Sequence, residues 1–518
     1  MLDRLPLSTR LAAAIPSGVN LSCYHISTQP VPSAALFSPV PSQPDQATTC
    51  ESHFLAISSP EDGEKKELLI FAVEILIFAT PTLTFIFVSK ADSSGFSSRL
   101  PSPKNAPSIV ATVTSTFIDF LLDSRLHNQK VVVSLFARAQ NQYLFPGSSD
   151  NSGKHVLDDR QLIKWWSRVL DRTMRHHHHD PAQTSKVVAH LVVPGCDQAE
   201  TKAFFPPATR QNPISEPKWF SSYPVDLLVQ DASQPPRFLI PRLPDDPKAR
   251  FLDDLDNDFI DNQGQWRSVK SLRDFWEMMS YRQECSAGRL VGFIWMIFSR
   301  GQASRLSRPP ANQAAPQLTT PEASQVQETL GTEPQLMPGQ QVSTTAGLKS
   351  PPPSSPVQDS FVDSQNTDDT GLLDSNSFGS EIGTDLAFER DAIESTKGQV
   401  VVNTDQYDQL MDFMLQTDFT GEDLAAESTR GWINKILEIS KASTIGYQIR
   451  GESIVGDSLK PGAGTSIPPP VNVLTNIRKK RKADQEDRTS KPAVNEQTSL
   501  PVTVNTLATS LVRKKPKT

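Results

Sequence analysis

Apolar residues recur along the chain in two patterns, a near-continuous one that is typical of buried strands and a helical one. Residues 68–88, LLIFAVEILIFATPTLTFIFV, are almost entirely apolar and rich in Ile, Val, Phe and Thr. This composition favours strands of a sheet that is covered on both faces, broken here near Pro81. The segment is long enough to span a membrane, but Glu74 and Pro81 lie inside it and would be costly there. We therefore expect two buried strands rather than a membrane helix.

Apolar patterns elsewhere predict alternating strands and helices over the first part of the chain. Further strands are expected at VNLSCYHIST, KVVVSLFARA, VVAHLVVPG and RLVGFIWMIFS. Helices are expected at LSTRLAAAI, SIVATVTSTFIDFLLDSRL, VLDDRQLIKWWSRVLDRTM and SLRDFWEMMSYRQECSAG. Together these elements predict an α/β (α+β) domain with a mixed central sheet wrapped by helices.

The composition changes along the chain and predicts four parts. Residues 302–398 are rich in Pro, Ser, Gln and Thr with few aromatic residues, which is typical of a disordered linker. Residues 399–440 have the periodicity of two helices. Two helices bury little apolar surface alone, so they should pack back onto the first domain. The expected parts are the domain at 1–301, the linker at 302–398, the helical pair at 399–440 and a disordered basic tail at 441–518.

Charge and cysteine content favour the nucleus. The net charge of the chain is −7, yet from Arg478 to the end eleven Lys and Arg residues stand against four Asp and Glu. The clusters NIRKKRKADQ and LVRKKPKT are typical of nuclear import signals or nucleic-acid contacts, although a solvated tail explains either one alone. The four cysteines are far apart without a CxxC pair, which disfavours a zinc site and a disulfide framework and fits a reducing compartment.

The first candidate for chemistry is an acidic stretch, LPDDPKARF. It places Asp245 and Asp246 between prolines, with Lys248 just beyond. Two adjacent carboxylates in a partly buried site need compensation, so one should have a raised pKa and act as a general base. A proline-initiated turn with an aspartate helix cap explains the same residues. Walker, GxSxG, HExxH and dinucleotide motifs are absent from the sequence.

The second candidate is the loop QNQYLFPGSSDNSGKH and the helix that follows it. Lys154 and His155 end a Ser/Gly loop at a strand-to-helix junction, where backbone amides and basic side chains can hold phosphates. Tyr143, Trp165 and Trp166 would wall an apolar tunnel for an acyl chain or a lysine stem. Ordinary core packing explains these aromatic residues equally well.

The histidine run His176–His179 resembles an internal purification tag. Chelation by such a run is conceivable because imidazole is a common metal ligand. Histidines in a polar loop more often have no such role, so no metal site is expected.

These motifs resemble those of a known family. SKADSSGF, FARAQNQYLFPGSSDNSGKHVLDDRQLIKWW and LPDDPKARFLDDL are similar to segments of the fungal histone H3 lysine-56 acetyltransferases, the regulator-of-Ty-transposition family. The resemblance extends over roughly residues 1–300, the helical pair at 400–440 and the tail segment VNTLATSLVRKKPKT. It implies a fold similar to that of metazoan CREB-binding-protein acetyltransferases, with acetyl-CoA as donor and no metal.

The resemblance also implies partners and a setting. The substrate would be histone H3, at lysine-56 and also at tail lysines, and histone chaperones would assist. Membrane contact is not implied, and direct DNA binding is not required. The enzyme would act in the nucleus on chromatin, supporting nucleosome assembly in replication and the DNA damage response.

Individual residues take roles from the resemblance as well. Asp246 would be the catalytic acid with Asp245 beside it, and Lys248 would itself become acetylated. The residues implied to shape the substrate-lysine and acetyl pocket are Asp92, Tyr143 and Trp166. The residues implied to contact the cofactor are Ala91, Asp92, Ser93, Arg99, Phe136, Gln140, Lys154, His155, Val156, Leu157 and Trp165.

An acetyltransfer mechanism makes chemical sense of these residues. A lysine amine has a reference pKa of about 10.4, so it must lose its proton before it attacks a thioester. Burial among aromatic side chains lowers that pKa, and a nearby carboxylate can take the proton through water. We therefore expect Asp246 to meet Tyr143 and Trp166 around one substrate. The alternative is a non-catalytic chromatin scaffold that binds histones or DNA.

Overall fold

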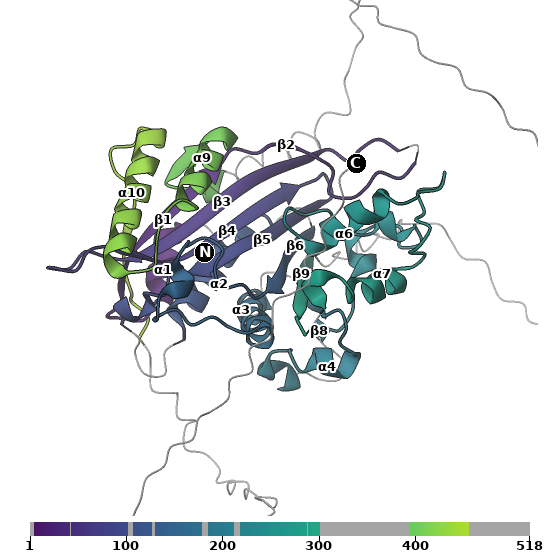
Figure 1. The fold of residues 1–518 in the computed structure, drawn as a ribbon, viewed down its shortest axis with the longest axis horizontal. Helices are drawn as coiled ribbons and strands as arrows, with labels where there is room; N and C mark the ends of the chain where they lie inside the picture. Colours follow the sequence, from purple (N-terminus) through teal and green to yellow (C-terminus); the bar gives the residue numbers. More distant parts are fainter. Residues whose placement is uncertain are drawn as a thin grey trace, which may run out of the picture. The chain divides into compact units, whose positions relative to one another are not determined.

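The apolar run at residues 68–88 forms two strands, β4 (Leu68–Ala79) and β5 (Leu83–Ser93), as its composition predicts. In this computed structural model they are central members of a mixed sheet of eleven strands (Figure 1). Both strands are buried along most of their length because helices cover both faces of the sheet. No helix within the described residues is long and apolar enough to cross a membrane.

The structure describes most of the first 300 residues and a later segment, all within one unit, Met1–Gly456. Most of the expected linker and the two basic clusters lie outside the described residues. The described ranges are 5–41, 43–101, 107–126, 130–178, 185–211, 218–286, 288–300 and 394–454.

The sheet combines antiparallel and parallel neighbours. The pairs β5–β6, β1–β10 and β7–β8 are parallel, and the remaining pairs are antiparallel. The expected strands at VNLSCYHIST, KVVVSLFARA, VVAHLVVPG and RLVGFIWMIFS are present as β1, β6, β7 and β9. In sheet order the strands are β10 (Val400–Val402), β1 (Asn20–Thr28), β3 (Thr48–Ser59), β4, β5, β6 (Lys130–Arg138), β9 (Val291–Arg300), β7 (Ser185–Val192) and β8 (Trp219–Phe220), while β2 (Val31–Ser33) pairs with β3 and β11 (Tyr447–Arg450) with β1.

Two groups of helices cover opposite faces of the sheet. Strand β9 shows this directly, because Ile294 packs in the core beneath α1 to α3, whereas Phe293 and Trp295 pack in the core beneath α6 and α7. Figure 1 shows α6 and α7 beside β9, and α9 and α10 beside β1 and β3. The helices are α1 (Leu7–Ala14), α2 (Ile109–Asp123), α3 (Asp159–His178), α4 (Gln198–Lys202), α5 (Val225–Leu228), α6 (Pro247–Asp256), α7 (Leu272–Met279), α9 (Thr404–Met414) and α10 (Glu422–Ser440).

The chain after the long insertion is built into the sheet. Trp432 of α10 packs edge-on against Tyr24 of β1, with ring centroids 5.9 Å apart. The hydroxyl of Tyr407 of α9 donates a 2.9 Å hydrogen bond to Oε1 of Glu74 in β4. Strand β11 also pairs with β1, so the expected start of the tail at residue 441 is too early.

The pairing between β5 and β6 ends before either strand does, and this creates a fork. The parallel pair runs from Leu83 and Lys130 only to Val88 and Leu135. Beyond that point β5 continues beside β4 as far as Ser93, and β6 continues beside β9 as far as Arg138. The two central strands therefore separate at their carboxyl ends.

The histidine run does not form the polar loop that was expected. His176 and His177 belong to the last turn of α3, and the side chain of His177 is buried. His179 lies outside the described residues.

Candidate active site

The acidic stretch begins helix α6. Asp246 is the N-cap residue, and its Oδ1 accepts a 2.9 Å hydrogen bond from the backbone N–H of Lys248. Pro247 occupies the first helical position, where its missing N–H costs little. Asp245 has a φ of 58°, in the left-handed region that Asp adopts more readily than most residues. The capping interpretation of this stretch is therefore correct at the level of local structure.

Lys248 turns the cap into a buried ion pair. Its side chain is 1% exposed, and its ammonium group contacts Oδ2 of Asp246. The same ammonium group lies 4.3 Å from the ring centroid of Phe293 and 5.4 Å from that of Trp295, within cation–π range. Burial lowers the pKa of Lys248, and the neighbouring Asp246 carboxylate partly opposes that shift. Both carboxylate oxygens of Asp246 are thus engaged by Lys248.

Asp245 has a different cation. Its Oδ2 lies 3.4 Å from Nζ of Lys90, which also lies 2.7 Å from Oε2 of Glu74. The side chain of Asp245 is 66% exposed, whereas that of Asp246 is 1% exposed. The expectation that the two carboxylates compete within one partly buried site is therefore wrong, because each is compensated by its own lysine.

Asp92, near the end of β5, organises the loop that follows β6. Its Oδ2 accepts hydrogen bonds from the backbone N–H groups of Tyr143 at 2.7 Å, Leu144 at 3.0 Å and Phe145 at 3.3 Å. Its Oδ1 accepts one from Nζ of Lys154 at 2.8 Å. A carboxylate with so many charge-assisted contacts is fixed in one orientation. Asp92 is consequently a positioning residue for the loop rather than an available base.

Lys154 is committed to this network. Its side chain is 4% exposed, and Nζ donates to Asp92 and, at 2.7 Å, to Oγ of Ser148. The expectation that its ammonium group meets phosphates is not supported by this arrangement, because the group is already paired with Asp92 at the end of β5 and with Ser148 of the same loop.

A cavity of about 270 Å³ lies at the fork, between the end of β5 and the start of α3. The rings of Trp165 and Trp166 meet there edge to face, with centroids 4.8 Å apart. The hydroxyl of Tyr143 donates a 2.7 Å hydrogen bond to the carbonyl of Arg138, and burial raises the pKa of Tyr143 to about 12. The expected site residues that line the cavity are Ala91, Asp92, Ser93, Gln140, Tyr143, Lys154, His155, Val156, Leu157, Trp165 and Trp166.

Two expected cofactor contacts lie elsewhere. Arg99 pairs with Glu422 of α10. Phe136 packs against Phe87 on the sheet face beneath α6 and α7, with ring centroids 6.1 Å apart. Strict alternation along β6 explains the second case, because its neighbours Leu135 and Ala137 take the opposite face.

Five further residues line the cavity and were not identified from the sequence. Val110 and Leu162 have the spacing of ordinary helix-core residues, so nothing in the sequence separated them from the core. Ala139 adjoins Gln140, and that adjacency was the available signal. The five residues are Phe71, Ser97, Val110, Ala139 and Leu162.

The acids and the aromatic cavity do not form one pocket. Asp245 and Asp246 line a separate cavity of about 350 Å³, together with Phe78 and Arg242. Trp166 packs in the core beneath α1 to α3, whereas Lys248 packs against aromatic residues of the opposite face. Trp166 and Lys248 therefore lie on opposite faces of the sheet, while Tyr143 packs against the core that α9 and α10 cover. The two cavities share no lining residue, and the expected meeting of Asp246 with Tyr143 and Trp166 around one substrate stays a prediction.

The aromatic cavity continues into a larger hollow of about 670 Å³. Ala139, Gln140, Val156 and Leu157 line both. The larger hollow adds Arg138, Arg289 and Asp159, and Oδ2 of Asp159 accepts a 3.0 Å hydrogen bond from Nε of Arg289. An elongated ligand with an apolar end and a polar end would match this sequence of surfaces.

Comparisons with known proteins agree with one another. The histone acetyltransferase KAT11-type domain matches residues 7–130 and 123–435. The chain is 38% identical over 572 aligned positions to the histone acetyltransferase rtt109 of Aspergillus flavus. This alignment covers 99% of this chain and 99% of the relative. It is 31% identical to the histone acetyltransferase rtt109 of Schizosaccharomyces pombe, over 54% of this chain and 68% of the relative. The crystal structure of Rtt109 from Aspergillus fumigatus matches with a TM-score of 0.65 and 35% identity, over 87% of this chain and 100% of that one.

Proposed function

The chain belongs to the histone acetyltransferases of the KAT11 type, and from that premise we propose that it moves the acetyl group of acetyl-CoA to lysine-56 of histone H3. Lysines of the H3 tail are further acceptors in this proposal. Histone chaperones present the substrate, and the reaction supports nucleosome assembly in replication and the DNA damage response. The observation that carries the proposal is the cavity at the β5–β6 fork, lined by eleven residues whose roles the family resemblance implies.

The donor is proposed to lie in the aromatic cavity. Acetyl-CoA would supply an acetyl thioester on an extended, flexible arm that ends in a phosphate-bearing nucleotide. Trp165 and Trp166 offer an apolar wall for the arm, and the hollow beside Arg138 and Arg289 offers cations for the polar end. Fixing the thioester at one place supplies much of the rate, because the amine then attacks within a single complex.

The acceptor lysine is proposed to approach the fork from the side of the acidic corner, which we define as Asp245, Asp246 and Lys248. The exposed carboxylate of Asp245 is the accessible acid there, so it can attract the incoming ammonium group and take its proton through water. The neutral amine nitrogen then bonds to the acetyl carbon while the carbon–sulfur bond breaks, and the thiolate that leaves takes up the second proton, which the nitrogen loses as the amide forms. Tyr143 stays protonated near neutral pH, and its hydroxyl proton is donated to the carbonyl of Arg138, so Tyr143 helps to hold the cavity wall.

Asp246 is proposed to act through Lys248. Both of its oxygens are engaged, so it cannot accept a substrate proton while Lys248 remains charged. Acetylation of Lys248 would remove that charge, relieve the cost of a buried ammonium group and keep an N–H donor for Asp246. Acetylated Lys248 would then fill the space beside Phe293 and Trp295 and fix the entrance to the fork.

A nuclear setting is proposed from the sequence outside the described residues. The clusters NIRKKRKADQ and LVRKKPKT are dense in Lys and Arg. Such clusters serve as import signals or as contacts to acidic partners.

Mass spectrometry of histone H3 tests the proposal. The full chain is incubated with H3–H4, acetyl-CoA and a histone chaperone, and acetylated peptides are quantified with and without the chaperone. We expect acetylation of lysine-56 that the chaperone increases. Acetylation confined to other histones, or none above the rate without enzyme, would contradict the proposal.

A further inference from the structure

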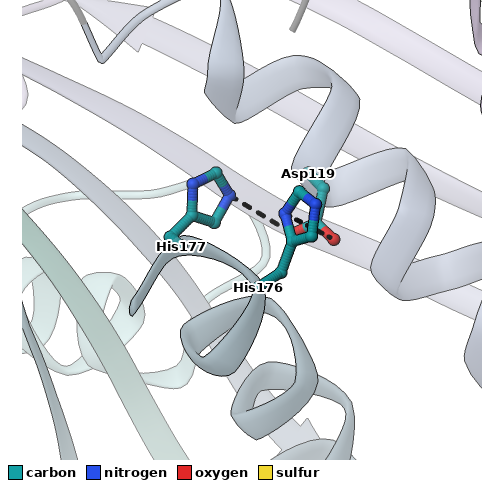
Figure 2. A group of neighbouring side chains, drawn as sticks. All are labelled: Asp119, His176 and His177. Carbon is teal, nitrogen blue, oxygen red and sulfur yellow. Dashed lines mark ion pairs between the residues drawn. The ribbon is translucent and has the colours of Figure 1, made fainter. Parts of the chain in front are cut away.

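The last turn of α3 brings two histidines against α2. His176 and His177 lie in the last turn of α3, while Asp119 and Asp123 lie four residues apart on α2 and so share one face of that helix. The two helices pack against each other, with Nη1 of Arg172 donating a 3.1 Å hydrogen bond to Oγ1 of Thr112. Figure 2 shows His176 and His177 turned towards Asp119 from the end of α3.

Three potential ligand atoms converge at this point. Nε2 of His177 lies 3.5 Å from Oδ1 of Asp119, and Nδ1 of His176 lies 3.9 Å from Oδ2 of the same carboxylate. One ligand atom from each of the three residues lies within 4.8 Å of the others. In a tetrahedral zinc site with bonds of about 2.1 Å, neighbouring ligand atoms are about 3.4 Å apart. Small side-chain rotations, mainly of the half-exposed His176, would reach that spacing.

A carboxylate also stands behind the buried histidine. Nδ1 of His177 lies 3.5 Å from Oδ1 of Asp123, whose side chain is 2% exposed and contacts the guanidinium group of Arg10. Metal-binding histidines commonly donate their second ring N–H to such a carboxylate, which fixes the tautomer and strengthens the ligand. Asp123 therefore has the position of an outer partner, and Arg10 holds it in place.

We propose that Asp119, His176 and His177 bind Zn²⁺ or a similar divalent transition metal at the junction of α2 and α3. Two imidazoles and one carboxylate are a donor set that zinc, cobalt and nickel accept. The half-exposed position of His176 leaves access for a water molecule as a fourth ligand. The donor set does not suit Mg²⁺ or Ca²⁺, which prefer oxygen ligands throughout.

The site would fasten two helices that wall the aromatic cavity. Val110 of α2 and Trp165 and Trp166 of α3 all line that cavity. A metal bound only by the folded chain stabilises it in proportion to the logarithm of metal concentration over Kd. The expected role is therefore structural, a clamp on the cavity wall that takes no part in acetyl transfer.

A histidine run can bind metal without help from other residues. The experiment must therefore distinguish binding by the run alone from binding at the site that includes Asp119. The full chain, prepared without an affinity tag and stripped of metal, is titrated with Zn²⁺ by calorimetry. Asp119→Asn keeps every histidine and nearly the same shape but loses the carboxylate ligand. We expect one tight site in the wild-type chain and at least a tenfold higher Kd in Asp119→Asn. Equal affinity in the two proteins would assign the binding to the histidine run and overturn the proposal.

Two further measurements complete the test. Glu438→Gln removes an exposed carboxylate of α10 as a matched control and should leave the Zn²⁺ affinity unchanged. Co²⁺ replaces Zn²⁺ as a spectroscopic probe, and the wild-type chain should show the intense visible absorption of a four-coordinate ion. The Asp119→Asn protein, if folded by circular dichroism, should lose this absorption. If it does not fold, His176→Gln provides the same comparison, and unchanged binding there overturns the site.

Discussion

The acidic corner and the aromatic cavity flank the same fork and differ in almost every physical respect. In the corner, Asp246 and Lys248 satisfy each other in a dry environment, and both side chains are 1% exposed. In the cavity, Tyr143 and Trp166 border about 270 Å³ of open space. The carboxylate of Asp92 beside it is engaged by the backbone N–H groups of the loop. One region is closed and internally paired, whereas the other is open and pre-shaped.

The difference indicates that the two regions have separate tasks, donor binding in the cavity and control of stability and turnover in the corner. An open, apolar, pre-formed cavity is suited to binding a donor before reaction. A buried ion pair contributes little net stability but makes its surroundings sensitive to any change in charge. The cavity is therefore expected to control donor affinity, and the corner to control stability and turnover.

The largest effect is expected on stability, when the ion pair between Asp246 and Lys248 in the acidic corner is removed. Asp246→Asn keeps a capping side chain but leaves the buried ammonium group of Lys248 without its anion, which should cost about 3–5 kcal/mol of unfolding free energy. Asp197→Asn is the matched control, because Asp197 caps α4 in an exposed position without a buried lysine. Urea denaturation should show a loss in the control below about 0.5 kcal/mol.

A double substitution sharpens this result. In Asp246→Asn/Lys248→Met the uncompensated ammonium group is gone, so most of the lost stability should return. Equal losses in the single and double variants would show that the ion pair is not the origin of the effect.

The next effect concerns the cavity. Asp92→Asn removes the negative charge that holds Lys154 and the loop amides, and lost charged hydrogen bonds cost about 1.5–3 kcal/mol. We expect acetyl-CoA to bind roughly tenfold to a hundredfold more weakly, measured by calorimetry. Asp226→Asn, on the exposed part of α5, serves as the control. Wild-type affinity in Asp92→Asn would refute the positioning role.

A smaller effect is expected from the tyrosine hydroxyl. Tyr143→Phe removes the hydrogen bond to the carbonyl of Arg138, which is worth about 0.5–1.5 kcal/mol. Because the pKa of Tyr143 is raised to about 12, the activity profile below pH 10 should contain no ionisation that disappears in Tyr143→Phe. An alkaline limb that the substitution removes would indicate that the phenolate has a role.

The pH dependence of the corner is the subtlest prediction. Burial lowers the pKa of Lys248 in the folded chain below the value of 10.5 that it has in the unfolded chain. At pH values between the folded and the unfolded pKa, the unfolded chain therefore binds more protons than the folded one. The stability contributed by neutral Lys248 is fully present above 10.5 and is lost as the pH falls through the folded value. Relative to Lys248→Met, the wild type should therefore gain unfolding free energy as the pH rises. A difference that stays constant with pH would contradict this.

The sequence predicted the elements far better than their partners. Residues 68–88 were expected to form two strands because composition and Pro81 act locally. Most cavity residues were also found, since the family resemblance covers contiguous motifs. The pairing of Arg99 with Glu422 joins segments that are distant in the chain, and no local pattern encodes it.

The placement of Trp166 and Lys248 on opposite faces of the sheet was missed for a related reason. Which face of the sheet a residue takes depends on strand register, and one step along β6 moves a side chain to the opposite core. Phe136 shows this, as does the position of Lys248 against Phe293. The histidine run was misjudged because α3 continues one turn further than its apolar pattern indicated.

Hydrogen–deuterium exchange of the full chain, with and without acetyl-CoA, tests the proposal that the donor binds in the aromatic cavity on the α2–α3 side of the fork. Ordering by the ligand should slow exchange in residues 139–143 and 154–157, which line the cavity or the hollow beside it, and leave α6 unchanged. Slower exchange confined to residues 242–253, around the acidic corner, would contradict the account.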